Sequence, residues 1–161
     1  MHKWTIGVLM AMAFSLSACG DNSASFPIWL AQKWKLTQLY NGSANIPMHS
    51  YTKDEGAFVV FNNNGSFTGN AGCNAFFGNY ISSETNDIQF GGVGMTRKMC
   101  GPESMAVEDT FIKLFADGGG TIAKLEGDTL SLARGEIRAT LVRVDTFAPL
   151  TTQERDSVDE R

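Results

Sequence analysis

Short runs of alternating apolar and polar residues dominate the first half of the chain. Within residues 34–40 the apolar positions alternate and then slip by one, which predicts a strand with an irregularity near its end. A five-residue apolar run at 57–61 is followed by Asn62-Asn63-Asn64-Gly65 and then by a second run at 66–69. Because Asn-Gly accommodates the positive φ angles of a tight turn, these runs predict a β-hairpin.

The last third of the chain repeats this pattern. Apolar runs at 122–125, 129–132 and 137–144 are separated by the turn sequences Glu126-Gly127-Asp128 and Arg134-Gly135-Glu136. In the last run, alternate apolar residues share one face of a strand. The pattern predicts a second β-meander.

One segment, Pro102 to Phe115, has helical periodicity. Its proline suits a first helical turn, where the missing N–H would be unpaired in any case. Apolar residues then follow at spacings of four, three and one and form one stripe: Val107, Phe111, Leu114 and Phe115. The charged residues are expected on other, solvated faces of this helix: Glu108, Asp109 and Lys113.

Composition agrees with a β-rich domain and narrows the choice of partners. The chain has 17 glycines but only 4 prolines, and phenylalanine supplies most of the aromatic residues, which is typical of short strands joined by tight turns. A length of 161 residues suits one folded domain. The formal charge of −4, without a basic cluster, argues against nucleic acid as a partner.

The first 18 residues resemble a bacterial lipoprotein signal peptide. Lys3 precedes an apolar run that ends in Leu16-Ser17-Ala18-Cys19, a sequence similar to a lipobox. The run is too short for a stable transmembrane helix. We therefore expect a signal peptide at 1–18, lipidation of Cys19 and a flexible tether at 19–28.

The three cysteines fit this assignment. Lipidation would account for Cys19, which leaves Cys73 and Cys100 in an oxidising compartment, where disulfides persist. We predict that these two residues form a structural disulfide. The alternatives are a reactive thiol or a metal site, but a zinc site would have only His49 and carboxylates to complete it once His2 is removed with the leader.

Between residues 65 and 132 the chain resembles the META domain, as found in the heat-shock HslJ family of bacterial lipoproteins. Trp34 fits the early tryptophan of that family, so the resemblance covers about residues 29–144. The other matching residues are Gly65, Gly69, Gly72, Cys73, Asn74, Phe76, Gly78, Tyr80, Met95, Thr96, Met99, Cys100, Glu103, Phe111, Leu114 and Leu130-Ser131-Leu132.

This resemblance implies an α+β fold, a small β-rich domain whose antiparallel sheet is wrapped around one α-helix. It would span residues 29–145, followed by an acidic tail at 146–161 that we expect to be disordered. The family has no established catalytic residues, so the resemblance implies neither an active site nor a cofactor or metal. The motif residues are interpreted as structural: Gly72, Asn74, Phe76, Gly78, Tyr80, Thr96 and Met99. Gly72 and Gly78 would permit unusual backbone angles or close approaches, and Asn74 would bond the backbone of its own turn.

Three classes of function follow. The favoured one, implied by the resemblance, is a non-enzymatic accessory lipoprotein that supports envelope integrity under heat or novobiocin-type antibiotic stress. The second is a pilot- or chaperone-like module that binds a lipid, a peptide or an outer-membrane protein through an apolar groove lined by Phe77, Phe90 and Met95, with Phe76 and Tyr80 as further candidates.

A hydrolase is the third and least favoured class. It would need His49 as a base, or paired acids drawn from Glu103, Glu108 and Asp109. Gly20, rather than aspartate, follows the predicted lipidated cysteine, which favours the outer membrane over the inner one. The expected location is therefore the outer membrane, facing the periplasm, although Asp21 follows directly.

Overall fold

The computed structural model describes residues 27–48, 56–82 and 86–144. Along these residues the elements run β1 (Lys33–Asn41), β2 (Ala44–Asn45), β3 (Phe58–Phe61), β4 (Ser66–Asn70), β5 (Ala75–Ser82), β6 (Asp87–Met95), α1 (Pro102–Phe111), the 3₁₀ helix η1 (Ile112–Phe115), β7 (Gly118–Glu126), β8 (Thr129–Arg134) and β9 (Ile137–Arg143). The predicted signal peptide, Cys19, His49 and the acidic tail lie outside the described residues.

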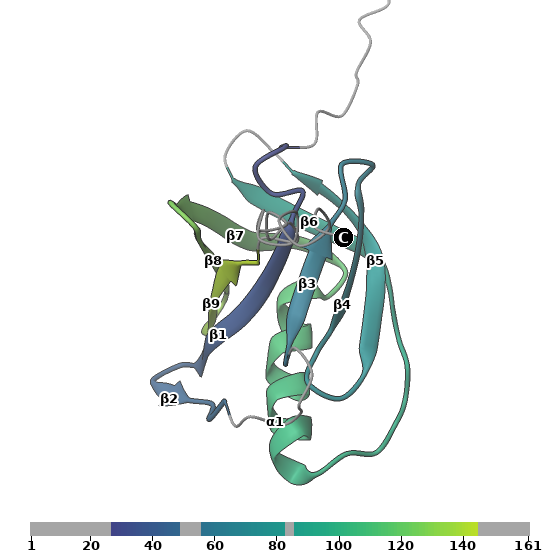
Figure 1. The fold of residues 1–161 in the computed structure, drawn as a ribbon, viewed down its shortest axis with the longest axis vertical. Coiled ribbons are helices and arrows are strands. Elements are labelled where there is room, and N and C mark those ends of the chain that lie inside the picture. The colour runs from purple at the N-terminus through teal and green to yellow at the C-terminus, as the bar shows by residue number, and fades with distance from the viewer. Residues whose placement is uncertain (1–26, 49–55, 83–85, 145–161) are drawn as a thin grey trace, which may run out of the picture.

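The strands form one antiparallel sheet that closes on itself (Figure 1). Their order is β2-β1-β3-β4-β5-β6-β7-β8-β9, and β1 also pairs with β9 from Trp34↔Arg143 to Asn41↔Ile137. This seam makes a barrel of β1 and β3 to β9, with the two-residue β2 as an extension on β1. The expected α+β, β-rich class is confirmed, but the sheet is a closed barrel and not an open sheet wrapped around a helix.

The predicted irregularity in β1 is a bulge. The pairing with β9 shifts between Leu36 and Gln38, so that Thr37 has no partner in the register and its hydroxyl donates to the Thr140 carbonyl at 3.0 Å. A bulge places one extra residue in a strand and so shifts the alternation of faces. As a result both Leu36 and Leu39 point into the core.

Two strands that the sequence did not predict lie between the hairpin and the helix. β5 and β6 lie between Cys73 and Cys100, where the sequence pattern indicated no strand, and they pair from Phe76↔Met95 to Ser82↔Ile88. In β5 burial alternates strictly. Glycines interrupt the apolar pattern of β6, which is why periodicity did not reveal it.

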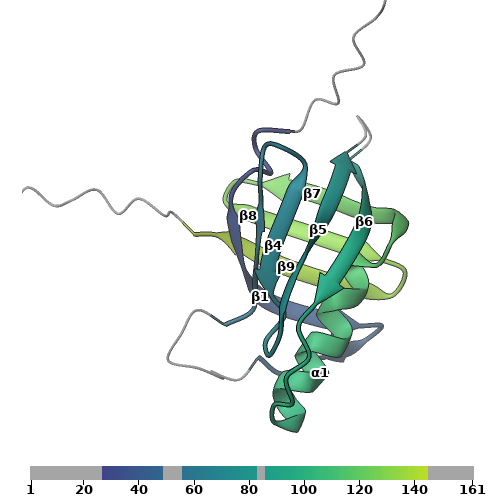
Figure 2. The ribbon, with the colours of Figure 1, turned by 90° about the vertical axis from the view of Figure 1, so that its right-hand side faces the viewer.

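The helix lies at one end of the barrel and packs against its inner face (Figure 2). The predicted helix at 102–115 is confirmed, with its last four residues as the 3₁₀ turn η1. The whole predicted apolar stripe is buried. The ring of Phe115 sits 4.8–5.5 Å, centroid to centroid, from four other phenylalanines: Phe67, Phe76, Phe90 and Phe111. These tilted and edge-on contacts fix the helix inside the barrel end.

Candidate functional site

The predicted disulfide is present and links two segments at the helix end of the barrel. Cys73, in the turn between β4 and β5, is bonded to Cys100, just before α1, with 6.0 Å between the Cα atoms. Cys73 is buried and Cys100 is exposed. The bond therefore ties the exposed segment 96–101 to the barrel.

A buried polar cluster lies directly beside this disulfide. Asn74 is 2% exposed, and its Oδ1 accepts hydrogen bonds from the Lys98 backbone N–H at 2.6 Å and the Thr96 hydroxyl at 2.9 Å. Its Nδ2 donates to the Lys98 carbonyl at 3.1 Å and to Oε1 of Glu108 at 3.0 Å. The Asn74 backbone N–H donates to Oε2 of Glu108 at 2.7 Å. One asparagine thus joins β5, the segment 96–101 and α1.

Glu108 is the main correction to the sequence analysis. It was expected on a solvated helix face but is 3% exposed, and both of its carboxylate oxygens accept hydrogen bonds from Asn74. A buried carboxylate is tolerated only when its oxygens are satisfied. Among the described residues, none of the buried side-chain nitrogen and oxygen atoms is left without a partner. Asp109, its neighbour, is exposed as predicted.

Asn74 also differs from expectation, because its side chain bonds the Cys73 sulfur at 3.5 Å and the segment 96–101 rather than the backbone of its own turn. That task falls to Asn70, whose Oδ1 accepts from the Gly72 backbone N–H at 2.8 Å. Gly72 has φ +110°, and a Cβ there would lie 3.4 Å from the Ser104 carbonyl and from Val107 of α1. Gly72 therefore supplies both the backbone angle and the close approach to the helix.

The glycine and aromatic motif residues pair across strands. Phe67 lies over Gly78, its partner in the β4–β5 register, and Phe76 lies over its own partner, Gly69. A Cβ on Gly78 would lie 2.7 Å from the Phe67 ring. Tyr80 is buried, and its hydroxyl donates to the Asn62 carbonyl at 2.7 Å. Burial raises the pKa of the Tyr80 phenol.

The structure does not bring the predicted groove residues together on one surface. Phe90 is in the core, as are Phe76 and Tyr80, whereas Phe77 points outward from β5 and is 54% exposed, with its ring over Gly94. Met95 is partly buried against the core. Because side chains alternate along β5, Phe77 points to the face opposite to that of Phe76 and Tyr80. The prediction that Phe77, Phe90 and Met95 line one groove is therefore wrong.

The two remaining motif residues, Thr96 and Met99, lie on the exposed segment 96–101. Thr96 belongs to the polar cluster, and its hydroxyl also accepts from the Ala75 backbone N–H at 3.1 Å. Met99 is 99% exposed and does not contribute to the core.

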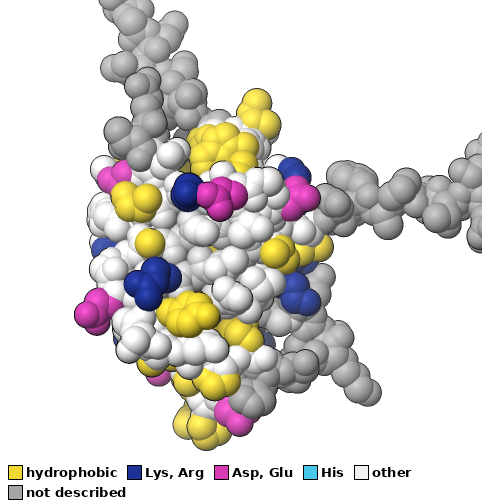
Figure 3. Space-filling view, turned by 90° about the vertical axis from the view of Figure 1, so that its left-hand side faces the viewer, with side chains coloured by type: hydrophobic (Ala, Val, Ile, Leu, Met, Phe, Trp, Pro, Cys, Tyr) yellow, Lys and Arg dark blue, Asp and Glu magenta, His cyan; other side chains and the backbone are white. Residues whose placement is uncertain are grey.

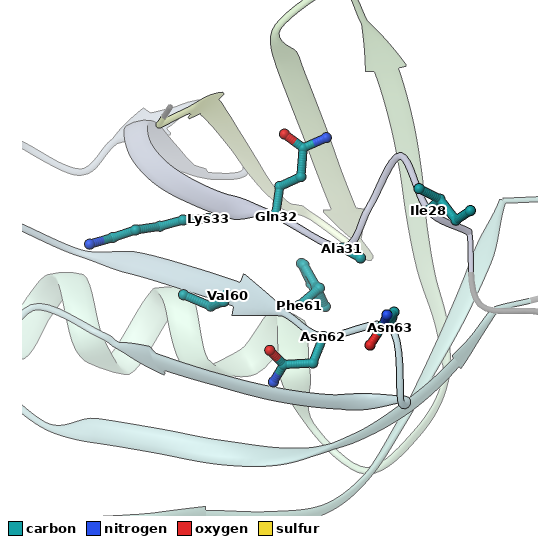
Figure 4. Close-up of a pocket in the computed structure, with 8 residues that line it drawn as sticks. All are labelled: Ile28, Ala31, Gln32, Lys33, Val60, Phe61, Asn62 and Asn63. Carbon is teal, nitrogen blue, oxygen red and sulfur yellow. The ribbon is translucent and has the colours of Figure 1, made fainter. Parts of the chain in front are cut away.

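A surface depression lies at the opposite end of the barrel, where the chain enters β1 (Figure 4). It has a volume of about 540 Å³ and separates the segment before β1 from the β3–β4 turn. Its lining residues are Ile28, Ala31, Gln32, Lys33, Val60, Phe61, Asn62 and Asn63. The sequence analysis named none of them as a site residue, and it assigned Asn62 and Asn63 to a turn.

Within 27–48, 56–82 and 86–144, no group of three His, Cys, Asp or Glu side chains could hold a metal ion. Of the three acids considered for hydrolysis, Glu108 is bonded to Asn74, while Glu103 and Asp109 are exposed. In the part of the chain that the structure describes, no helix is long and apolar enough to span a bilayer.

Fold and site together define a small disulfide-linked β-barrel domain that is closed at one end by a helix. The META domain family matches residues 29–146, so the chain belongs to the META-domain family. No curated protein matches it.

Two solved structures share the fold. A protein from Burkholderia xenovorans, solved by NMR, has a TM-score of 0.59 at 17% identity, covering 89% of this chain and 99% of that one. A second protein solved by NMR has a TM-score of 0.56 at 22% identity, covering 71% of this chain and 90% of that one. At these identities the likeness establishes the fold alone.

Proposed function

We propose that this chain is a non-enzymatic outer-membrane lipoprotein that supports envelope integrity under heat or novobiocin-type stress. Membership of the META-domain family suggests a bacterial envelope or stress-related protein. The lipobox-like sequence at Cys19 supports a lipid anchor, and Gly20 after it favours the outer membrane with the domain facing the periplasm. The Cys73–Cys100 disulfide suits an oxidising compartment.

The observation that supports the non-enzymatic assignment is that the polar atoms of the motif residue Asn74 are hydrogen-bonded within the protein. The side chain of Asn74 bonds the Thr96 hydroxyl, the Glu108 carboxylate and the Lys98 backbone. A catalytic group must present an atom within hydrogen-bond reach of a substrate. The motif therefore serves to hold the segment 96–101 and α1 on the barrel.

The test is a deletion strain complemented with the wild-type gene or with Cys19→Ala. Heat and novobiocin survival should fall on deletion and should return with the wild type but not with Cys19→Ala. The intact mass of the membrane-extracted protein, measured before and after reduction and alkylation, should show acyl mass at Cys19 and two thiols released only by reductant. Unchanged survival in the deletion strain would remove the stress role, and a mature chain without acyl mass would remove the anchor.

The depression beside Ile28 favours a second function, a pilot- or chaperone-like module for a lipid, a peptide or an outer-membrane protein. Its walls combine the apolar Ile28 and Val60 with the amides of Asn62 and Asn63. An environment-sensitive hydrophobic dye should bind there, and Ile28→Ser should weaken that binding more than Met99→Ser, which changes an exposed residue at the other end. Equal binding by both variants would argue against a ligand in the depression.

A further inference from the structure

Exposed apolar side chains gather at the end of the barrel where the chain enters β1. Ile28, Ile81, Ile122 and Leu125 are called the entry rim below, and Ile28 is 83% exposed. Ile81 is one residue from the end of β5, Leu125 is one residue from the end of β7, and Ile122 is paired with the first residue of β6. Figure 3 shows hydrophobic side chains at the surface at this end of the molecule, and others lower on the same face.

The elements that carry the rim residues are neighbours along this edge of the barrel. Ile28 and Asn63 both line the depression, and the β3–β4 turn that contains Asn63 contacts β5, because the Tyr80 N–H donates to the Gly65 carbonyl at 2.7 Å. Ile81 follows Tyr80, and β6 links β5 to β7, which carries Ile122. Scattered exposed apolar residues need no explanation, but a row of them along one edge does.

The charges at this end are balanced. Lys124 is paired with Glu126 at 2.6 Å, and Arg143 is paired with Asp128. The remaining described charges near the rim are Lys33, whose ammonium lies over the Phe58 ring, and Asp87, which accepts from the Gly120 N–H. The described charges near the rim therefore sum to zero, although the whole chain carries −4. A neutral apolar edge can approach a phospholipid surface without charge repulsion.

The short length of chain between Cys19 and the rim favours the bilayer as the surface that the rim contacts. Eight residues separate Cys19 from Ile28, and an extended chain spans at most about 3.5 Å per residue. A lipid on Cys19 would keep the rim within roughly 30 Å of the bilayer surface. The anchor thus gives the bilayer surface a high effective concentration at the rim. A contact that would be too weak to bind without the anchor can then form.

We infer that the entry rim, led by Ile28 and the adjacent Trp29, docks on the bilayer that carries the lipid anchor. This inference rests on the lipoprotein function proposed above. Tryptophan and isoleucine suit this place, because amphipathic and apolar side chains partition into the interfacial region. Docking would fix the orientation of the domain, with the disulfide, the segment 96–101 and the start of α1 directed away from the membrane (Figure 1).

Trp29 is a built-in probe of this contact. Cleavage before Cys19 would remove Trp4, and Trp34 is fully buried. Trp29 is only partly buried where it packs against the core, so in the mature chain it is the more exposed tryptophan. The full-length gene is expressed, and the mature lipoprotein is purified from membranes and reconstituted into vesicles of phosphatidylethanolamine and phosphatidylglycerol. Flotation first establishes anchoring, and quenching of tryptophan emission by lipids brominated near the headgroup then reports contact, with Trp29→Phe as the baseline.

The expected result is flotation with clear quenching, which Ile28→Ser lowers by about half because the leading apolar contact is lost. Met99→Ser, at the other end of the barrel, should leave quenching unchanged. Replacing phosphatidylglycerol with phosphatidylcholine should also change little, since the described charges near the rim sum to zero. Flotation without quenching, or with equal quenching in Ile28→Ser, would overturn the docked orientation and leave the anchor in place. A protein that does not float would overturn both proposals.

Discussion

At the residue scale, Glu108 shows how one polar side chain can organise several elements. Its carboxylate accepts both the backbone N–H and the side-chain amide of Asn74, and Asn74 in turn holds the Lys98 backbone. The sequence contained a signal for this burial, since Glu108 precedes Phe111 by three positions and Phe115 by seven, on the same side of the helix. Its charge nevertheless predicted a solvated position, because charged residues usually face solvent.

We predict that Glu108→Gln destabilises the fold by about 1–3 kcal/mol, because the new amide NH₂ faces a donor of Asn74 and leaves a buried polar group unsatisfied. Urea unfolding measures the change in the free energy of unfolding. Asp109→Asn is the matched control, because Asp109 is the exposed neighbour on the same helix, and it should have little effect. Equal losses in the two variants would show that the polar cluster adds no stability.

Tyr80 makes stability sensitive to alkaline pH. Burial raises the pKa of its phenol above the ordinary value of 10.0. Above pH 10 the unfolded chain loses this proton while the folded chain keeps it, so the free energy of unfolding should fall as pH rises from 10 toward the folded-state pKa. Tyr80→Phe should be less stable at neutral pH, because the hydrogen bond to Asn62 is lost, but should show a shallower alkaline fall in the same urea titrations. Parallel pH curves for the two proteins would contradict this assignment.

At the scale of elements, strand pairing in β4 and β5 depends on positions without side chains. A Cβ on Gly69 would lie 2.4 Å from the Phe58 carbonyl oxygen and 2.6 Å from the Phe76 ring. Gly69→Ala should therefore lower stability by about 1–3 kcal/mol through overpacking. Gly91→Ala, in β6, is the control, because its Cβ would have no atom within 4 Å. Thermal unfolding of the two variants compares these positions directly. If Gly69→Ala were as stable as Gly91→Ala, the strands would be able to accommodate the added Cβ without loss of stability.

The disulfide acts at the same scale, by joining the β4–β5 turn to the segment before α1. It closes a loop of 27 residues, for which loop entropy gives about 3.5 kcal/mol. The double variant Cys73→Ala/Cys100→Ala should lose about 2–4 kcal/mol in urea unfolding. It should still fold, because Asn74 continues to hold Lys98 and Glu108. Addition of reductant should destabilise the wild type by a similar amount and leave the double variant unchanged, and a reductant effect on the double variant would contradict this account.

For the whole molecule, the seam between β1 and β9 joins the two ends of the described chain. The hairpins at either end of the sequence were predictable, because their turns and alternation are local signals. The seam was not, since it pairs Trp34 with Arg143, residues far apart in sequence. Closure also leaves the barrel with two different ends, one holding the helix and the disulfide and the other the entry rim.

The sequence by itself determined the features that depend on neighbours along the chain: the β-rich class, the hairpin at 57–69, the helix at 102–115 with its apolar stripe, and the pairing of the two cysteines left after Cys19 was assigned to the anchor. Only the tertiary structure decided closure of the sheet, burial of Glu108 against Asn74, separation of Phe77 from Phe90, and the gathering of exposed apolar residues at one end. These features depend on register and on contacts between distant segments, and a shift of one residue in register reverses which face a side chain occupies. Local periodicity does not fix the register or the contacts between distant segments, so packing of the whole chain decides them.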